Sequence, residues 1–142
     1  MADSTASVTW NGSLMEGEGT IDRVGSGVLE ELPVTWKART GETGGQTTPE
    51  ELLAAAHASC FSMALSHGLA QGGTPAEQLE TSATVTFVPG TGITRVGLRV
   101  RGRVPGMDEA AFVEAAEAAK AGCPVSKALA AVPEITLDAA LS

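Results

Sequence analysis

Short runs in which apolar and polar residues alternate occur in the first third of the chain. Alternation over Val8–Trp10 ends at the turn pair Asn11-Gly12, and a second alternating run covers Val34–Arg39. The stretch 41–46 that follows is rich in glycine and polar residues. We therefore predict short strands over the two runs and a loop after them.

A longer pair of alternating runs lies in the second half of the chain. These runs cover Thr81–Val88 and Ile93–Val104, and the turn-like segment between them predicts a β-hairpin. The second run separates two kinds of residue onto its two faces: Arg95, Arg99, Arg101 and Arg103 on one, and Val96, Leu98, Val100 and Val104 on the other. A last alternation, Ile135–Asp138, predicts a strand near the C-terminus.

The clearest helix start in the chain is Thr48-Pro49-Glu50-Glu51. Thr48 is a suitable N-cap, proline is favoured at the first helical position, and Glu51 stands where a capping box needs a carboxylate. The residues that follow are apolar on nearly every face until Gly72-Gly73. A helix of this kind is usually surrounded by protein, so we predict a long and largely buried helix.

Two further helices are predicted before the last strand. Asp108 is a suitable N-cap for a helix that runs to Ala121, with Gly122 just after its end. Cys123-Pro124 then opens a short helix through Leu129, again with proline at the first position. The order of elements predicts an α+β fold in which helices pack on a mostly antiparallel sheet.

Size and composition limit the core that one chain can build. The 142 residues correspond to a single domain over 1–142. Hydrophobic residues make up 43% of the chain, but aromatic residues only 4%, and tyrosine is missing. Small side chains bury little area, and each Å² of buried apolar surface contributes only about 25 cal/mol. We therefore expect an oligomer that completes its core between subunits.

The charge of the chain argues against two classes of partner. Nine basic against 17 acidic residues give a formal net charge of −8, which repels nucleic acid and anionic membranes. The arginine-bearing strand face is accordingly interpreted as a solvated surface. No signal-peptide pattern opens the chain, and histidines and serines interrupt the apolar tract Leu52–Ala70, so no membrane span is expected. We expect a cytoplasmic protein, in which thiols stay reduced.

The two cysteines are the first candidates for chemistry. Cys60 lies inside the predicted long helix, where a lone cysteine is usually an inert small hydrophobe. Cys123, the only other cysteine, stands at the start of a predicted helix, where backbone N–H groups favour a thiolate. Two cysteines of a cytoplasmic chain fit a reversible redox pair if the fold brings them together, which their spacing does not decide.

His57 shares a helix face with Cys60, three residues further along. The two could form a cysteine–histidine nucleophile pair, but a hydrogen-bonded core histidine is the commoner explanation. A zinc site formed by His57, His67 and the two cysteines is a weaker hypothesis. The two histidines point to different faces of the helix, and no C-x₂-C or H-x₃-H pair is present.

Two charged residues near the start of the long helix are further candidates. Glu51 is sufficiently explained as a capping residue. Glu50 stands ten residues before Cys60, too far along the helix to touch its sulfur, but it could orient a cation that does. Arg39 is the nearest such cation upstream. Without further information, it is most simply a surface arginine.

The residues around both cysteines resemble a known family. The segment Thr48–Leu65, with the sequence TPEELLAAAHASCFSMAL, is similar to the signature helix of the OsmC/Ohr hydroperoxide peroxidases. The segment Ala121–Ser126, AGCPVS, resembles the second cysteine motif of that family, and the likeness covers nearly the whole chain. His57 and the wording of the second motif favour the OsmC branch. The resemblance implies mostly antiparallel sheets around a central helix, in an intertwined homodimer with active sites at the subunit interface.

The resemblance also implies a role for four residues. Cys60 matches the peroxidatic cysteine, Cys123 the resolving cysteine, Arg39 the cation near the thiolate, and Glu50 the carboxylate that orients that arginine. No catalytic role is implied for His57. Apolar surroundings from Leu53, Phe61, Met63 and interface partners would suit organic hydroperoxides as substrates.

The implied activity is the reduction of organic hydroperoxides, and less efficiently of hydrogen peroxide, to alcohols in oxidative or osmotic stress defence. A sulfenic acid and then an intramolecular disulfide would form, and an external dithiol, of lipoyl type for example, would reduce the disulfide. No metal or other cofactor is required. A non-catalytic binder of small apolar ligands at the dimer interface is the alternative, and the missing C-x-x-C motif disfavours a disulfide oxidoreductase.

Overall fold

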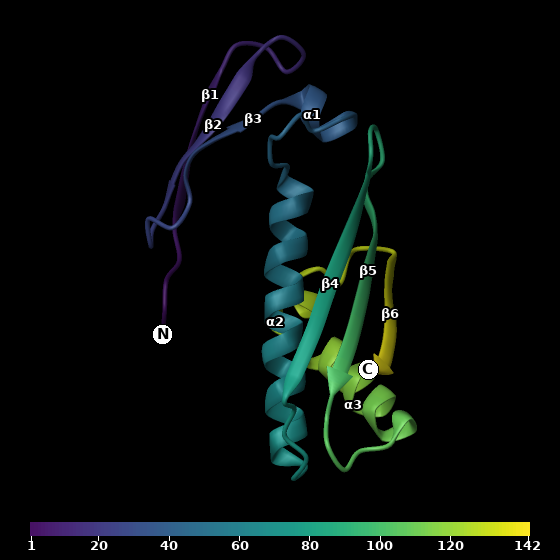
Figure 1. The fold of residues 1–142 in the computed structure, drawn as a ribbon. Coiled ribbons are helices and arrows are strands. Elements are labelled where there is room, and N and C mark those ends of the chain that lie inside the picture. Colours follow the sequence, from purple (N-terminus) through teal and green to yellow (C-terminus); the bar gives the residue numbers. More distant parts are fainter. The chain divides into compact units, whose positions relative to one another are not determined.

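A computed structural model describes residues 1–142, and these form two compact units, Met1–Leu52 and Leu53–Ser142, which are described separately. The first unit opens with three strands, β1 (Ala6–Asn11), β2 (Glu18–Val24) and β3 (Glu30–Val34). They form an antiparallel sheet in the order β1-β2-β3 (Figure 1). All six residues of β1 are exposed within the single chain.

The predicted strand over Val34–Arg39 is wrong beyond its first residue. Strand β3 ends at Val34, and the residues after Thr35 form a short helix, α1 (Trp36–Thr40). The reason is local: the Thr35 hydroxyl accepts a hydrogen bond from the Ala38 backbone N–H at 3.2 Å, which caps the helix. Arg39 therefore belongs to a helix and not to a strand.

The long helix α2 (Pro49–Gln71) begins where its capping sequence predicts. The Thr48 hydroxyl accepts a hydrogen bond from the Glu51 N–H at 3.0 Å, and Pro49 is the first helical residue. The helix starts in the first unit and continues through the second.

The second unit holds the predicted hairpin, β4 (Gln78–Val88) and β5 (Gly92–Arg103), followed by α3 (Glu109–Gly122), α4 (Pro124–Ala128) and β6 (Glu134–Leu141). The sheet order is β4-β5-β6; β4 and β5 pair antiparallel, whereas β5 and β6 pair in parallel. Helices α3 and α4 form the crossover that a parallel connection needs. Asp108 caps α3 as predicted, accepting the Ala111 N–H at 2.8 Å.

The core of the second unit lies where α2 and α3 pack on one face of this sheet, and Figure 1 shows the sheet beside α2. Its buried residues come from all three elements and from Cys123: Phe61, Leu65, Leu69, Leu98, Val100, Val104, Phe112, Ala116, Ala119 and Cys123. Gly102 makes this packing possible, because a Cβ there would lie 2.5 Å from the Phe112 ring. The apolar face predicted for β5 is thus confirmed.

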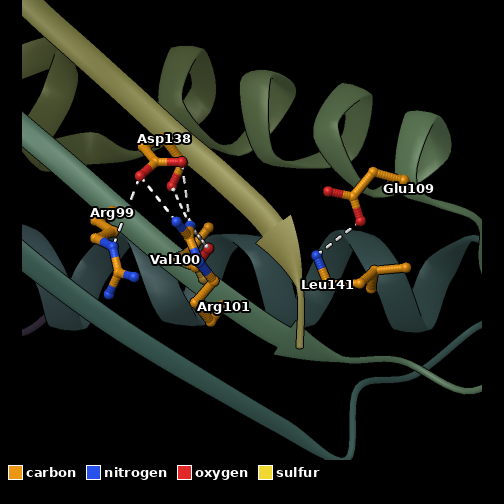
Figure 2. Close-up of polar contacts among 6 residues, drawn as sticks. All are labelled: Arg99, Val100, Arg101, Glu109, Asp138 and Leu141. Carbon is orange, nitrogen blue, oxygen red and sulfur yellow. Dashed lines mark hydrogen bonds and ion pairs between the residues drawn. The ribbon is translucent and has the colours of Figure 1, made fainter.

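The opposite face of β5 carries the arginines, each with an acidic partner. Arg95 pairs with Glu134, Arg103 with Glu77, and Arg99 and Arg101 both pair with Asp138. Figure 2 shows Arg99 and Arg101 converging on Asp138 of β6. The interpretation of this face as a solvated surface is confirmed, and every arginine on it is ion-paired.

The prediction that α2 is largely buried is wrong for the single chain. Phe61, Leu65 and Leu69 are buried, but Met63 is 71% exposed and several alanines on the remaining faces are exposed as well. By length and composition alone α2 could also cross a membrane, contrary to the expectation from its polar interruptions. Its packing into the core cluster is instead that of the central helix of a soluble fold. The predicted α+β architecture, with two sheets and a central helix, is confirmed.

Candidate active site

Cys60 lies on the face of α2 that packs against the core, with Phe61 fully buried beside it. The Cys60 side chain itself is only partly buried. The thiol therefore lies at the edge of the core. Phe61, fully enclosed by this core, makes the surroundings of the thiol apolar.

Cys123 stands at the junction of two helices, because Pro124 cannot continue α3. Its backbone N–H donates to the Ala119 carbonyl at 2.9 Å, and its carbonyl accepts from the Lys127 N–H at 3.1 Å. Cys123 thus ends α3 and caps α4, and it is completely buried. Backbone hydrogen bonds on both sides hold this cysteine in place.

The fold brings the two cysteines together: they come within 3.1 Å of one another, and both are free thiols. A disulfide bond is about 2.05 Å long, so oxidation of the pair by two electrons needs only a small further approach to form the bond. The pairing that sequence spacing left undecided is therefore a property of the structure.

The two thiols differ in acidity. Burial raises the pKa of Cys60, and the side chain of Cys123 raises it further, against the lowering influence of the Val125 backbone N–H. Burial also acts to raise the pKa of Cys123. There, however, the Ser126 backbone N–H, the Cys60 side chain, the Val125 N–H and the Ser126 hydroxyl outweigh burial, and the pKa is lowered. Within the single chain, Cys123 is the more readily ionised thiol.

His57 lies one turn before Cys60 on α2 and is completely buried. Its Nε2 atom is 2.7 Å from the hydroxyl of Ser126 on α4, whereas its Nδ1 atom is buried without a partner. Burial lowers the pKa of His57, so the ring is neutral at physiological pH. The prediction of a hydrogen-bonded core histidine is confirmed.

Arg39 and Glu50, in the first unit, form a close ion pair. Arg39 Nη2 lies 2.7 Å from Glu50 Oε1, and Arg39 Nε lies 3.0 and 3.2 Å from the two carboxylate oxygens. The guanidinium also lies 5.9 Å from the centre of the Trp36 ring, within the range of a cation–π contact. Arg39 is therefore partly buried and paired with Glu50, which is more than the simple surface arginine considered from the sequence.

The charge pair belongs to the first unit and the thiol pair to the second. Ten residues of α2 separate Glu50 from Cys60, a rise of about 15 Å along the helix axis. No group of three or more His, Cys, Asp or Glu side chains is arranged to hold a metal ion. The hypothetical zinc site is therefore not assembled.

Sequence reasoning missed Ser126, whose hydroxyl is hydrogen-bonded to His57. The signal was present in the AGCPVS segment, because Ser126 is three residues after the helix-capping Cys123. Residues with this spacing at a helix start contact one another. The partner across the chain, His57, could not be found from local spacing.

An α+β chain that holds two free thiols in contact defines a two-cysteine thiol protein. The family model described as OsmC-like protein matches residues 41–138, which include both cysteines, and the chain belongs to this family. It is 44% identical over 133 residues to the Peroxiredoxin OsmC of Escherichia coli strain K12, covering 91% of this chain and 90% of that protein. The family predicted from the two cysteine motifs is confirmed.

Two solved structures with the same fold are those of organic hydroperoxide resistance proteins. An organic hydroperoxide resistance protein from Elizabethkingia anophelis, crystallised with thiocyanate, superposes with a TM-score of 0.72 at 25% identity, over 97% of this chain and 96% of that one. The organic hydroperoxide resistance protein OhrB of Bacillus subtilis gives a TM-score of 0.65 at 27% identity, over 97% and 98% of the two chains.

Proposed function

We propose that this protein reduces organic hydroperoxides to alcohols with its two cysteines. The class of enzyme, a cysteine-based peroxidase, is that of its peroxiredoxin relatives. The thiolate of Cys60 attacks the O–O bond, the alcohol leaves, and a sulfenic acid remains on Cys60. Cys123 then condenses with this sulfenic acid to a disulfide, with loss of water, and an external dithiol reduces the disulfide by exchange.

The observation that carries this proposal is the contact between Cys60 and Cys123, which come within 3.1 Å although they lie on elements far apart in the sequence. A sulfenic acid on Cys60 would form next to a thiol that ionises readily. Such an arrangement favours disulfide formation over further oxidation to sulfinic acid. It also disfavours the alternative of a non-catalytic binder, which has no need for a second thiol.

Cys60 needs a cation, because burial raises its pKa and only the thiolate attacks peroxide. The Arg39 guanidinium, oriented by Glu50, is the cation that we assign to it, since arginine keeps its charge at any physiological pH. The rise of about 15 Å along α2 keeps Glu50 away from the Cys60 of its own helix. We therefore place Arg39 and Glu50 of one copy against Cys60 of a second copy, in a homodimer.

The exposure of apolar residues supports the dimer. Strand β1 has no buried residue in the single chain, and its Trp10 remains 40% exposed. Met63 on α2 is 71% exposed. A second copy that covers these surfaces would supply the missing core and an apolar wall for the alkyl group of a hydroperoxide.

The remaining assignments follow from the same chemistry. The two sulfur atoms and the external dithiol carry both electrons of each cycle, so the reaction requires no metal or prosthetic group. We assign the protein to the cytoplasm, where dithiols of lipoyl type are available to reduce it. We treat residues 1–142 as one OsmC-like domain, because the match over residues 41–138 crosses the boundary between the two compact units.

The test is the consumption of cumene hydroperoxide by the purified protein with dihydrolipoamide as reductant. Wild-type protein is expected to turn over many equivalents of peroxide, and Cys60→Ser is expected to consume none while keeping its fold by circular dichroism. Retained turnover in Cys60→Ser would remove Cys60 from the mechanism. A folded wild-type protein that binds the peroxide without consuming it would favour the binder.

A further inference from the structure

The proposed peroxidase cycle uses neither the buried histidine nor the buried serine next to the thiol pair. His57 and Ser126 are both buried, and the 2.7 Å hydrogen bond between them joins α2 to α4. One end of this bond lies a turn from Cys60, and the other lies a turn from Cys123. Burying a polar pair costs desolvation free energy, so its position beside both thiols calls for a chemical explanation.

We propose that His57 and Ser126 form a hydrogen-bond chain, from the Nε2–H of His57 through the hydroxyl of Ser126 to the sulfur of Cys123, that holds Cys123 as the thiolate for disulfide formation. This inference rests on the proposed peroxidase cycle. In this chain Ser126 is the catalytic residue, because we place its hydroxyl against the reacting sulfur, whereas His57 acts through Ser126 and is a positioning residue.

The direction of this chain fixes the position of its protons. In it the Ser126 hydroxyl donates its single proton to the Cys123 sulfur, so its oxygen accepts from the Nε2–H of His57, 2.7 Å away. His57 then carries its proton on Nε2, and its Nδ1 is a bare acceptor. Nδ1 is the ring atom that lacks a partner, and a buried acceptor without a partner is tolerated better than a buried donor.

The neutral state of His57 agrees with this role. Burial lowers its pKa, so the ring remains a neutral donor with one N–H and does not compete as a base. Among titratable groups, Cys60 is the one that acts directly on Cys123, and His57 is one hydrogen bond further away. The chain therefore stabilises a negative charge on sulfur without adding a second charge to the core.

The step that the chain assists is the second half of the cycle. The Cys123 thiolate forms the S–S bond as the S–O bond of the Cys60 sulfenic acid breaks, and the hydroxide that leaves takes a proton from solvent to become water. The sulfur of Cys123 is oxidised and that of Cys60 is reduced. The first step, attack of Cys60 on peroxide, does not use Ser126.

The first experiment measures the Cys123 thiol alone, in the Cys60→Ser protein. The chain contains no tyrosine, so the ultraviolet absorbance of the thiolate can be titrated without interference from phenolate. Adding Ser126→Ala should raise the titration midpoint by about one pH unit, as expected for the loss of one hydrogen bond to a charged group. Ser126→Thr, which keeps the hydroxyl, should leave it within a few tenths of a unit.

His57 is tested by rescue in the same background. His57→Leu should also raise the midpoint, by less than Ser126→Ala, and His57→Gln should restore it because its amide N–H can reach the position of Nε2. The matched control is Ser62→Ala, which removes a partly buried hydroxyl of α2 that donates to Thr81 at 2.7 Å. A midpoint in Ser126→Ala equal to that in Ser62→Ala, or no difference between His57→Leu and His57→Gln, would overturn the proposal.

The second experiment separates the two steps in the two-cysteine protein. After one equivalent of peroxide, Ser126→Ala should form the Cys60 sulfenic acid as fast as wild type but the disulfide about tenfold more slowly, with more dimedone adduct. An unchanged rate of disulfide formation would refute the chain. If wild type itself consumed no peroxide, the proposed cycle would fail, and the titration of Cys123 would still decide whether the hydrogen-bond chain exists.

Discussion

Arg39 donates hydrogen bonds to both oxygens of the Glu50 carboxylate, from Nη2 to Oε1 at 2.7 Å and from Nε to Oε2 at 3.2 Å. The Glu50 side chain is only 8% exposed, whereas that of Arg39 is 30% exposed. A carboxylate buried at the start of α2 thus fixes the direction of a guanidinium that still reaches the surface. Two parallel hydrogen bonds give a planar geometry that a lysine could not reproduce.

This pair predicts that stability and activity can be separated. Arg39→Met should destabilise the fold by about 1–2 kcal/mol, because it leaves a buried carboxylate without its partner. It should also slow peroxide consumption at least tenfold, because Cys60 loses the cation assigned to it. In the double variant Arg39→Met/Glu50→Gln, stability should recover, since no buried charge remains, while activity should not.

Urea unfolding and the rate of peroxide consumption measure the two effects. Glu51→Gln is the matched control, because Glu51 is exposed and adjacent to Glu50 on the same turn. Activity that returned with stability in the double variant would mean that Arg39 serves the fold alone.

The start of α2 and much of the second unit could be predicted from the sequence because their signals are local. The caps Thr48 and Asp108, proline at the first position of α2 and α4, and the alternation of β5 each act within a few residues. The strand predicted over Val34–Arg39 is wrong because two local signals compete there. The alternation indicates a strand, but the Thr35 cap that starts α1 is the stronger signal.

The site was less predictable because its contacts join distant positions. The meeting of Cys60 with Cys123, and of His57 with Ser126, depends on how α3 and α4 pack on α2, which no spacing reveals. The exposure of α2 could not be predicted for a different reason. An apolar helix predicts burial, but the sequence does not say whether the same chain or a second copy covers it.

The exposed apolar surface predicts a protein whose stability depends on its concentration. If a second copy covers β1 and the exposed side of α2, folding and association are linked by mass action. The melting temperature should therefore rise with protein concentration, and sedimentation at micromolar concentration should give a dimer. Trp10→Ser, which changes an exposed apolar residue of β1, should weaken the dimer. A monomer that melts at a constant temperature would contradict this expectation.

The Asp138 carboxylate predicts a pH dependence of stability. Its hydrogen bonds from Arg101, at 2.9 and 3.2 Å, and then the nearby positive charges of Arg101 and Arg99, lower its pKa in the folded state (Figure 2). A lowered pKa means that the unfolded chain binds a proton more readily. The stabilisation is therefore complete above the ordinary aspartate pKa of about 3.9 and is lost as the pH falls through the folded value.

Asp138→Asn should remove this part of the acid dependence. Between about pH 4 and pH 2, the free energy of unfolding of the variant should fall less steeply than that of wild type in urea titrations. The difference should shrink in high salt, because the group is exposed. Asp22→Asn on β2 is the control. If the free energy of unfolding fell equally steeply with pH in wild type and in Asp138→Asn, the arginine contacts would not persist in solution.

The apolar surface near the thiols predicts a preference among peroxides. Burying an alkyl group contributes about 0.8 kcal/mol per CH₂, so cumene or tert-butyl hydroperoxide should have a kcat/KM at least tenfold above that of hydrogen peroxide. Met63→Gln should lower the value for cumene hydroperoxide more than the value for hydrogen peroxide, since the latter has no apolar part. Equal values for all three peroxides in wild type would remove the argument for an apolar wall.

The roles assigned to the two cysteines predict different fates for their serine variants. In Cys123→Ser, the thiol of Cys60 remains, so one equivalent of peroxide should still be consumed. The sulfenic acid then has no thiol partner within 3.1 Å, where wild type has Cys123. It should be trapped by dimedone and should advance to sulfinic acid under excess peroxide.

Cys60→Ser should give no adduct on Cys123, because Cys123 is completely buried in the core. Wild type should instead lose two hydrogens as it forms the disulfide, and dihydrolipoamide should restore them. Mass spectrometry after one equivalent of peroxide distinguishes these products. A Cys123→Ser protein that kept turning over at the wild-type rate would show that an external thiol, and not Cys123, resolves the sulfenic acid.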